Sequence, residues 1–185
     1  RDLATHLVRS QLLRQGFSLE EATLELAGRF GIDTLVMPAS NTPVRTQIHT
    51  IDGTLGFQEY FVREKCRPEV LDVTYNGAVT AEVPGNVIKS IMTADRILLA
   101  PSNPVTSIGP ILAIPSIYQA LCKTEAGIVA ISPIIGSQAV TGPAAQLMQA
   151  TGPEEVSAKA VVERYQDSQP QKSEAFFLKG SNALD

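Results

Sequence analysis

The spacing of apolar and polar residues changes several times along the chain, and over its first part it is helical. Apolar residues recur every three or four positions over 3–14, which predicts a helix that stops at Gly16. The Ser-Leu-Glu-Glu sequence that starts at Ser18 predicts a capping box, in which Glu21 reaches back to the serine. A second helix should therefore start at Ser18 and stop before Gly31.

The stretch that follows has the spacing of strands. Residues 44–51 alternate between polar and apolar side chains, which predicts a half-exposed strand, and the Asp52-Gly53 pair behind it predicts a turn. Two short apolar runs, 34–38 and 70–75, predict further strands. The segment 57–65 fits either a helix or a strand, and we favour a helix.

In the second half of the chain, predicted helices and strands alternate. The expected helices cover 86–94, 116–123, 143–150 and 157–166, and the expected strands cover 97–100 and 128–131. Such alternation is typical of βαβ units with a parallel sheet. Both strands are purely apolar, so we expect them to be buried on both faces. The prediction is an α/β protein with a Rossmann-like three-layer fold and a mostly parallel sheet.

Two long segments without charge follow these apolar strands and share one layout. Each strand leads into a loop rich in serine and proline, and each loop ends in a Gly-Pro pair, at 109–110 and at 142–143, that opens a helix. Loops at the carboxyl ends of parallel strands often bind ligands, and a helix N-terminus attracts anions. The layout predicts a cleft for a ligand with a phosphate and a flat polar ring. Ser-Pro and Asn-Pro pairs also form ordinary turns, so a purely structural role remains open.

Composition narrows the function classes. The chain has 185 residues, 44% hydrophobic and 18% charged, with a net charge of -4, which fits one globular domain with a core. No basic block or nucleic-acid-binding motif is present, so we expect no nucleic-acid partner. Prolines interrupt both neutral segments, so we expect no membrane span. The start lacks the apolar region of a signal peptide, so we expect a cytoplasmic protein.

Residues for metal or nucleophilic chemistry are scarce. The two cysteines, Cys66 and Cys122, are far apart, which favours a reducing compartment over a disulfide framework. With only His6 and His49 besides them, a His/Cys metal cluster is not expected. The chain has no GxGxxG, GxxxxGK[ST], GxSxG or HExxH motif. The residues by themselves therefore predict a cleft for an anionic ligand and no particular reaction.

Four stretches of the chain resemble one known family. They are RDLATH (1–6), FQEYFVR (57–63), LLAPSNPVTSIGPILAIPSI (98–117) and AISPIIGSQAVTGPAAQLM (130–148). Together they are similar to the 2-phospho-L-lactate transferase family, often called CofD, and the likeness covers roughly residues 1 to 167. The chain resembles the central and C-terminal portion of that family.

The resemblance implies a reaction and a set of site residues. A phospholactyl or phosphoenolpyruvyl group would pass from a guanosine-diphosphate-activated donor to the deazaflavin Fo, with Mg²⁺ assisting, as a step of coenzyme F-420 biosynthesis. The residues that it implies for substrate and nucleotide binding are Ser102, Asn103, Pro104, Ser107, Gly109, Ser132, Pro133, Arg1, Asp2 and His6. It assigns no catalytic residue and no metal ligand in this chain. For His6, a packing or surface role on the first helix is the alternative.

The departures from the family define what else we expect. The family's first strand and its glycine-rich phosphate loop have no counterpart here, so we expect residues 1–167 to form one α/β domain that is incomplete at its N-terminal side. Residues 168–185 are expected to be a divergent or flexible tail. A sheet without its first strand exposes an edge, and we expect a homodimer. Two alternatives to a transferase remain open, namely a non-catalytic nucleotide or nucleotide-sugar binding relative and an interaction module with a vestigial cleft.

Overall fold

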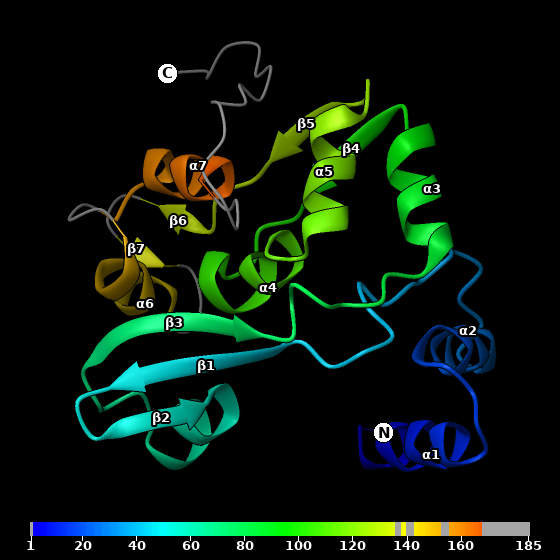
Figure 1. Ribbon diagram of the computed structural model, residues 1–185, viewed down its shortest axis with the longest axis horizontal. Coiled ribbons are helices and arrows are strands. Elements are labelled where there is room, and N and C mark those ends of the chain that lie inside the picture. Colours follow the sequence, from blue (N-terminus) through cyan, green and yellow to red (C-terminus); the bar gives the residue numbers. More distant parts are fainter. Residues whose placement is uncertain (1, 136–137, 140–142, 153–155, 168–185) are drawn as a thin grey trace.

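The computed structural model describes residues 2–135, 138–139, 143–152 and 156–167 (Figure 1). Its helices are α1 (Asp2–Arg14), α2 (Leu19–Arg29), α3 (Gly85–Thr93), α4 (Gly109–Leu112), α5 (Pro115–Lys123), α6 (Ala144–Thr151) and α7 (Ala158–Gln166), with π-helical turns η1 (Glu59–Arg63) and η2 (Pro104–Ile108). Its strands are β1 (Arg45–Thr50), β2 (Gly53–Gly56), β3 (Val70–Asn76), β4 (Arg96–Leu99), β5 (Gly127–Ala130), β6 (Ile134–Ile135) and β7 (Gln138–Ala139). Arg1, Gly142 and the predicted tail 168–185 lie outside the described residues.

The first two helices form the hairpin that the spacing predicted. Gly16, with φ +93°, ends α1 in a conformation that side-chain-bearing residues rarely adopt. The capping box is present, because Ser18 Oγ accepts from the Glu21 N–H at 3.1 Å and Glu21 Oε2 accepts from the Ser18 N–H at 2.7 Å. Hydrogen bonds that the Ser18 N–H and the Ser18 hydroxyl donate to the Glu21 carboxylate lower the pKa of that carboxyl. Both helix predictions are confirmed.

The predicted strands 44–51 and 70–75 form an antiparallel sheet of order β2-β1-β3. A turn at Gly53, with φ +128°, joins β1 to β2 as the sequence predicted. One face of this sheet packs on the core through Ile48, which is fully buried. On the other face His49 bonds the hydroxyls of Thr54 and Thr74 at 2.9 and 2.8 Å, so polar side chains of all three strands form one row.

The ambiguous segment 57–65 is helical in part, as we favoured, and forms the π-helical turn η1. Tyr60 points into the core, while Phe57 and Phe61 stack with their ring centroids 5.6 Å apart. The turn ends in two consecutive left-handed residues, Lys65 and Cys66, with φ 53° and 56°.

The strand predicted over 34–38 is wrong. This segment is irregular and pairs with no strand in the described part of the chain. Its apolar side chains do not fill a sheet, since Leu35 and Val36 are largely exposed, and Leu35 and Met37 instead line an apolar groove. A short apolar run cannot by itself distinguish a strand from the wall of a groove.

The two predicted apolar strands pair in parallel as β4 and β5, with Leu98 opposite Val129. Together with the surrounding helices they confirm the predicted α/β fold with a parallel sheet. The expectation that both faces are buried is wrong, because Leu98 is 62% and Val129 53% exposed. Ile97, Leu99 and Ile128 face the other way, toward cavities beneath α5 and α4. One face of the parallel pair is thus uncovered by the described residues.

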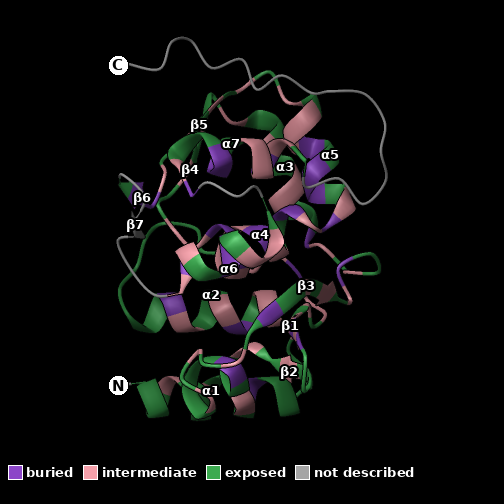
Figure 2. Cartoon of the chain, turned by 90° about the vertical axis from the view of Figure 1, so that its left-hand side faces the viewer, coloured by how far each residue is buried: buried purple, intermediate pink, exposed green. Residues whose placement is uncertain are grey.

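The remaining predicted helices are present as α3, α5, α6 and α7. The main core lies between α5, α6, α7 and the antiparallel sheet, whereas α3 packs on a second cluster with Ile114 and Ile117. The fully buried members of the main core include Ile48, Tyr60, Val105, Leu147 and Val161. Figure 2 shows this purple interior in the middle of the molecule, whereas α1 at the bottom is mostly exposed. Within the described residues no single helix is long and apolar enough to cross a membrane, and only the pair Pro104–Leu112 and Pro115–Lys123, bent by 81°, reaches that length and composition together.

Candidate functional site

The two serine- and proline-containing segments start at the same edge of the parallel pair. Because Leu99 lies opposite Ala130, the stretches that follow these two residues leave the carboxyl ends of neighbouring strands. The first is not the open loop that we expected, since η2 and then α4 begin within it. The second is described over 131–135, at 138–139 and again from Pro143, so only part of the segment before its Gly-Pro pair can be followed.

Asn103 accepts hydrogen bonds from the backbone of the residues that follow it in the first segment. Its Oδ1 accepts hydrogen bonds from the backbone N–H groups of Val105 at 2.9 Å and Thr106 at 3.2 Å, which caps η2. Its carbonyl oxygen accepts from the N–H groups of Ser107 and Ile108. These four amides of η2 are therefore not free to meet an anion. Asparagine is one of the residues preferred at helix N-caps, so its place before η2 has a structural explanation.

Tyr75 of β3 fixes the same segment from the side of the antiparallel sheet. Its hydroxyl donates to the carbonyl oxygen of Val105 and rests against Gly109. A Cβ at position 109 would overlap this hydroxyl and lie 2.8 Å from the Pro104 carbonyl oxygen, so the glycine is required for packing. Burial raises the pKa of Tyr75, and the nearby positive charge of Arg164 partly opposes that rise. Pro104 is itself buried, so positions 104 and 109 shape the segment from within.

Three hydroxyls remain available on this braced segment. Ser102, Thr106 and Ser107 are half-buried, and their hydroxyl groups make no hydrogen bond to any described residue. The predicted residues Ser102 and Ser107 are thus brought together on one short stretch. Thr106 and Tyr75 were missed from the sequence. Thr106 lies inside the quoted stretch and could have been found there, whereas Tyr75 comes from a distant strand and gave no local signal.

The second segment places Ser132 in a turn. Ser132 Oγ accepts from the Ile134 N–H at 3.0 Å and donates to the Ile134 carbonyl at 3.3 Å, which is a local serine turn. Pro133 beside it is buried. Ser132 follows β5 as Ser102 follows β4, so both reach the same edge of the parallel pair.

The residues predicted at the chain start lie elsewhere in the structure. Arg1 is outside the described residues, and Asp2 and His6 lie on α1, which packs on α2. His6 Nδ1 accepts from Arg9 Nη2 at 3.0 Å on an exposed helix face. Figures 1 and 2 both place α1 at the bottom of the molecule, away from α4. The described residues do not bring Asp2 and His6 to the segments after β4 and β5.

The described residues do not fit a metal centre of their own. No group of three or more His, Cys, Asp or Glu side chains gathers anywhere in the described ranges. Cys66 and Cys122 are both free thiols, and burial raises the pKa of each. We therefore assign no step to the Mg²⁺ that the resemblance implied.

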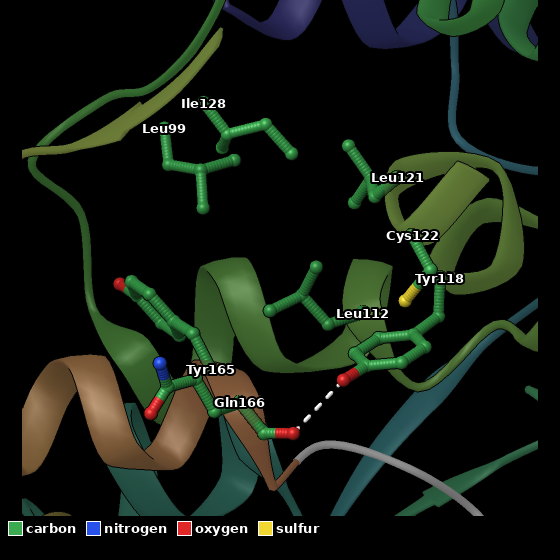
Figure 3. Close-up of a pocket in the computed structure, with 8 residues that line it drawn as sticks. All are labelled: Leu99, Leu112, Tyr118, Leu121, Cys122, Ile128, Tyr165 and Gln166. Carbon is green, nitrogen blue, oxygen red and sulfur yellow. Dashed lines mark hydrogen bonds between the residues drawn. The ribbon is translucent and has the colours of Figure 1, made fainter. Parts of the chain in front are cut away.

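Two cavities border the parallel pair, and both are apolar. The smaller, of about 40 Å³, lies between Leu99, Ile128, Cys122 and the ring of Tyr165, and Tyr118 donates to the Gln166 carbonyl at 2.8 Å beside it (Figure 3). The Tyr165 hydroxyl is buried without a partner among the described residues, and burial raises the pKa of Tyr165 to about 12. The larger, of about 380 Å³, is an open groove that runs past Ile97, Leu99 and Ile108. Neither is lined by the three available hydroxyls.

Comparisons with known proteins agree on one family. The model of the family described as 2-phospho-L-lactate transferase CofD matches residues 1–182. A 2-phospho-L-lactate transferase of Methanosarcina acetivorans is 45% identical over 90% of this chain and 53% of its own length. A phosphoenolpyruvate transferase of Mycolicibacterium smegmatis is 42% identical over 85% of this chain and 50% of its own length.

A solved structure gives the same fold. A UPF0052-family protein of Bacillus halodurans matches with a TM-score of 0.56 and 20% identity, over 67% of this chain and 39% of that protein. This likeness is consistent with the predicted Rossmann-like fold. The chain spans about half the length of the curated relatives that it matches.

Proposed function

Because the chain belongs to the 2-phospho-L-lactate transferase CofD family, we propose that it contributes the nucleotide- and acceptor-binding part of such an enzyme. The transferred group is phospholactyl or phosphoenolpyruvyl, the donor is its guanosine-diphosphate-activated form, and the acceptor is the deazaflavin Fo. The names of the relatives include both kinds of transferase, and no described residue distinguishes the two groups.

The observation that carries this proposal is the braced segment after β4. Asn103 and Tyr75 fix its backbone, while the hydroxyls of Ser102, Thr106 and Ser107 have no partner in the described part of the chain. Hydroxyls held in place can donate to phosphate oxygens without reorganising during the reaction. Neutral donors at the carboxyl ends of parallel strands suit a diphosphate and a polyhydroxyl chain.

In this reaction the residues of the chain need not form a covalent bond to the substrate. A hydroxyl oxygen of the acceptor forms a bond to the distal phosphorus of the donor, the bond from that phosphorus to the bridging oxygen breaks, and GMP leaves with the electron pair. The acceptor's proton is released to solvent or to a base. The part of this chain is to hold the donor's oxygens and the attacking hydroxyl close together, which is the main source of rate in such transfers.

A binding protein without catalysis is the second candidate, and one observation favours it. The described residues contain no cluster of acidic side chains that could hold a metal at the diphosphate. In that case the hydroxyls would still bind the nucleotide, and no product would form. The predicted homodimer belongs to the same set of proposals, and sedimentation of the chain tests it directly.

A fluorescence titration with Fo, with and without GDP and Mg²⁺, tests binding. We expect saturable binding that GDP strengthens. We expect Ser102→Ala and Ser107→Ala each to weaken it by roughly ten- to hundredfold, since a hydrogen bond to a charged group is worth about 1.5–3 kcal/mol. Ser90→Ala, an exposed hydroxyl of α3, is the matched control and should change nothing.

The outcomes separate the candidates. Binding with the expected serine dependence but no product from the activated donor would favour the binding protein. Equal affinities for Ser102→Ala, Ser107→Ala and Ser90→Ala would contradict the assignment of the site. Loss of binding in all forms of the chain would place the ligand contacts outside these 185 residues.

A further inference from the structure

Arg164 of α7 contacts the end of a second helix. It lies in the last turn of α7 and is half-buried. Its Nη1 donates to the carbonyl oxygen of Thr151, the last residue of α6, at 3.3 Å. Carbonyl oxygens at the end of a helix lack partners within that helix, and a cation is favourable there. The arginine therefore stabilises the end of α6 against α7.

The same guanidinium contacts Tyr75 of β3. Burial raises the pKa of Tyr75, while the positive charge of Arg164 and a side-chain hydrogen bond from it oppose that rise. A guanidinium has only donors, so the Tyr75 oxygen accepts in this bond and keeps its own proton to donate. Tyr75 donates that proton to the carbonyl oxygen of Val105. A hydroxyl that accepts one hydrogen bond becomes a stronger donor in the next, so the two bonds strengthen each other.

The Tyr75 hydroxyl connects this arginine to the segment after β4. Val105, whose carbonyl oxygen accepts from the hydroxyl, is fully buried and directly precedes Thr106. The same hydroxyl lies against Gly109, where α4 begins. The hydrogen bonds that start at Arg164 therefore end on the backbone that carries the available hydroxyls.

Packed helices hold the arginine in place. α6 packs on β3 and η2, and α7 contacts η2. Val105 of η2, Leu147 of α6 and Val161 of α7 are all fully buried members of the main core. Side chains on packed helices keep their positions better than side chains on loops. A residue in this place can therefore fix the position of η2 without lying in the site itself.

We propose that Arg164 is a positioning residue, which acts through Tyr75 to hold the segment 102–109 in the form that binds the phosphate oxygens of the donor. This inference rests on the proposed function, which supplies the ligand. Arg164 takes no part in making or breaking bonds of the substrate. Without it, Tyr75 is a weaker donor and the end of α6 loses its cation, so we expect η2 to open more often. Each opening displaces the hydroxyls that this segment carries.

Measurements on the free chain test this linkage without any ligand. We expect Arg164→Met to speed hydrogen exchange at the Thr106 and Ser107 amides by on the order of tenfold, because the segment opens more often. The pKa of Tyr75, followed by absorbance against a Tyr75→Phe reference, should rise, since a positive charge and a hydrogen bond that lower it are lost. Arg164→Lys keeps the charge and should give intermediate values for both. Lys159→Met, which removes an exposed charge from the same helix, should change neither.

A calorimetric titration with GDP in Mg²⁺ then tests the effect on the site. We expect Arg164→Met and Tyr75→Phe each to weaken the binding of GDP by about tenfold, because each removes one hydrogen bond that holds the segment. The double variant should bind no more weakly than either single variant, since both changes break the same series of contacts. Protection of the Ile48 amide in β1 reports that each variant is folded.

The outcomes separate this proposal from the proposed function. A further loss of affinity from Arg164→Met in the Tyr75→Phe background would overturn the proposal, because the arginine would then act on the ligand directly. Unchanged exchange at Thr106 and an unchanged pKa of Tyr75 in a folded Arg164→Met variant would overturn it as well. If the unaltered chain binds neither GDP nor Fo, the proposed function fails, and the exchange measurement by itself decides whether Arg164 holds the segment.

Discussion

The antiparallel sheet β2-β1-β3 and the parallel pair β4–β5 differ in how far the described residues satisfy them. In the antiparallel sheet, one face packs Ile48 into the core and the other carries the polar row around His49. In the parallel pair, the inner face meets cavities and the outer face leaves Leu98 and Val129 exposed. The described residues cover the apolar face of the first region, and they leave one face of the second exposed.

The hydrophobic pattern of a strand predicts how many of its faces are buried, and the two regions differ in whether the described residues provide that burial. The alternating pattern of 44–51 predicts a strand with one buried face, and the main core buries that face at Ile48. The unbroken apolar pattern of 97–100 predicts a strand buried on both faces, and the described residues cover only one of them. The mismatch between pattern and exposure therefore marks a face of the parallel pair that the described residues leave uncovered.

The largest contrast is expected from truncating one apolar side chain in each region. Ile48→Ala should lower the free energy of unfolding by about 2–5 kcal/mol, because it empties a fully buried site. Leu98→Ala should change it by less than about 0.5 kcal/mol, since most of that side chain is exposed. Chemical denaturation measures both. Equal losses would mean that the outer face of β4 is covered in solution.

A second contrast concerns glycines near the two ends of the parallel pair. Gly109→Ala should cost about 1–3 kcal/mol or more, because the added methyl meets the Tyr75 hydroxyl and the Pro104 carbonyl. Gly127→Ala at the start of β5 is the control, since no atom lies within 4 Å of its Cβ position, and it should be close to neutral. Thermal unfolding of the two variants decides. A harmless Gly109→Ala would show that the segment after β4 is loosely held.

A third contrast uses two tyrosines, the half-buried Tyr75 of β3 in the antiparallel sheet and the buried Tyr165 of α7 beside the parallel pair. Tyr75→Phe leaves the Val105 carbonyl without its donor and should cost about 1–3 kcal/mol. Tyr165→Phe removes a hydroxyl without a partner among the described residues and should be neutral or stabilising. Denaturation curves at pH 7 distinguish the two. A large loss for Tyr165→Phe would mean that water or another group satisfies that hydroxyl.

The smallest expected effect is on the pH dependence of stability. Burial raises the pKa of Tyr165 to about 12, above its value of about 10 in the unfolded chain, so the folded state holds this proton more tightly. Its contribution is complete below pH 10 and is lost as the pH rises from 10 toward 12, by about 1 kcal/mol at pH 11. Tyr165→Phe should flatten this decline. An unchanged slope would assign the decline to other groups, such as Tyr75.

Most of the fold could be predicted because its signals are local. The capping box at Ser18, the turn at Gly53 and the helical spacing of 116–123 each depend on residues close in sequence, and each is confirmed. The strand over 34–38 failed because its local pattern fits two environments, and only its distant neighbours decide between them. The exposure of Leu98 could not be predicted, since it depends on what covers the strand.

The candidate site was predictable in place and only partly in detail. The serines of the segment after β4 stand where the alternating pattern put them, at the end of a parallel strand. That Asn103 caps η2 and that Gly109 makes room for Tyr75 are facts of packing between distant segments. Asp2 and His6 had no such geometric support, because resemblance alone placed them near this site, and α1 lies apart from it.

The tight turn between β1 and β2 has a consequence for the order of folding. Thr50 pairs with Gly53 across it, so β1 and β2 can meet by closing a very short loop, a process that takes on the order of microseconds. Arg96 must instead find Gly127 through a long intervening stretch, which costs more chain entropy before any contact forms. We expect the β1–β2 hairpin to form early and the parallel pair late, because the first needs only local contacts and the second needs distant ones.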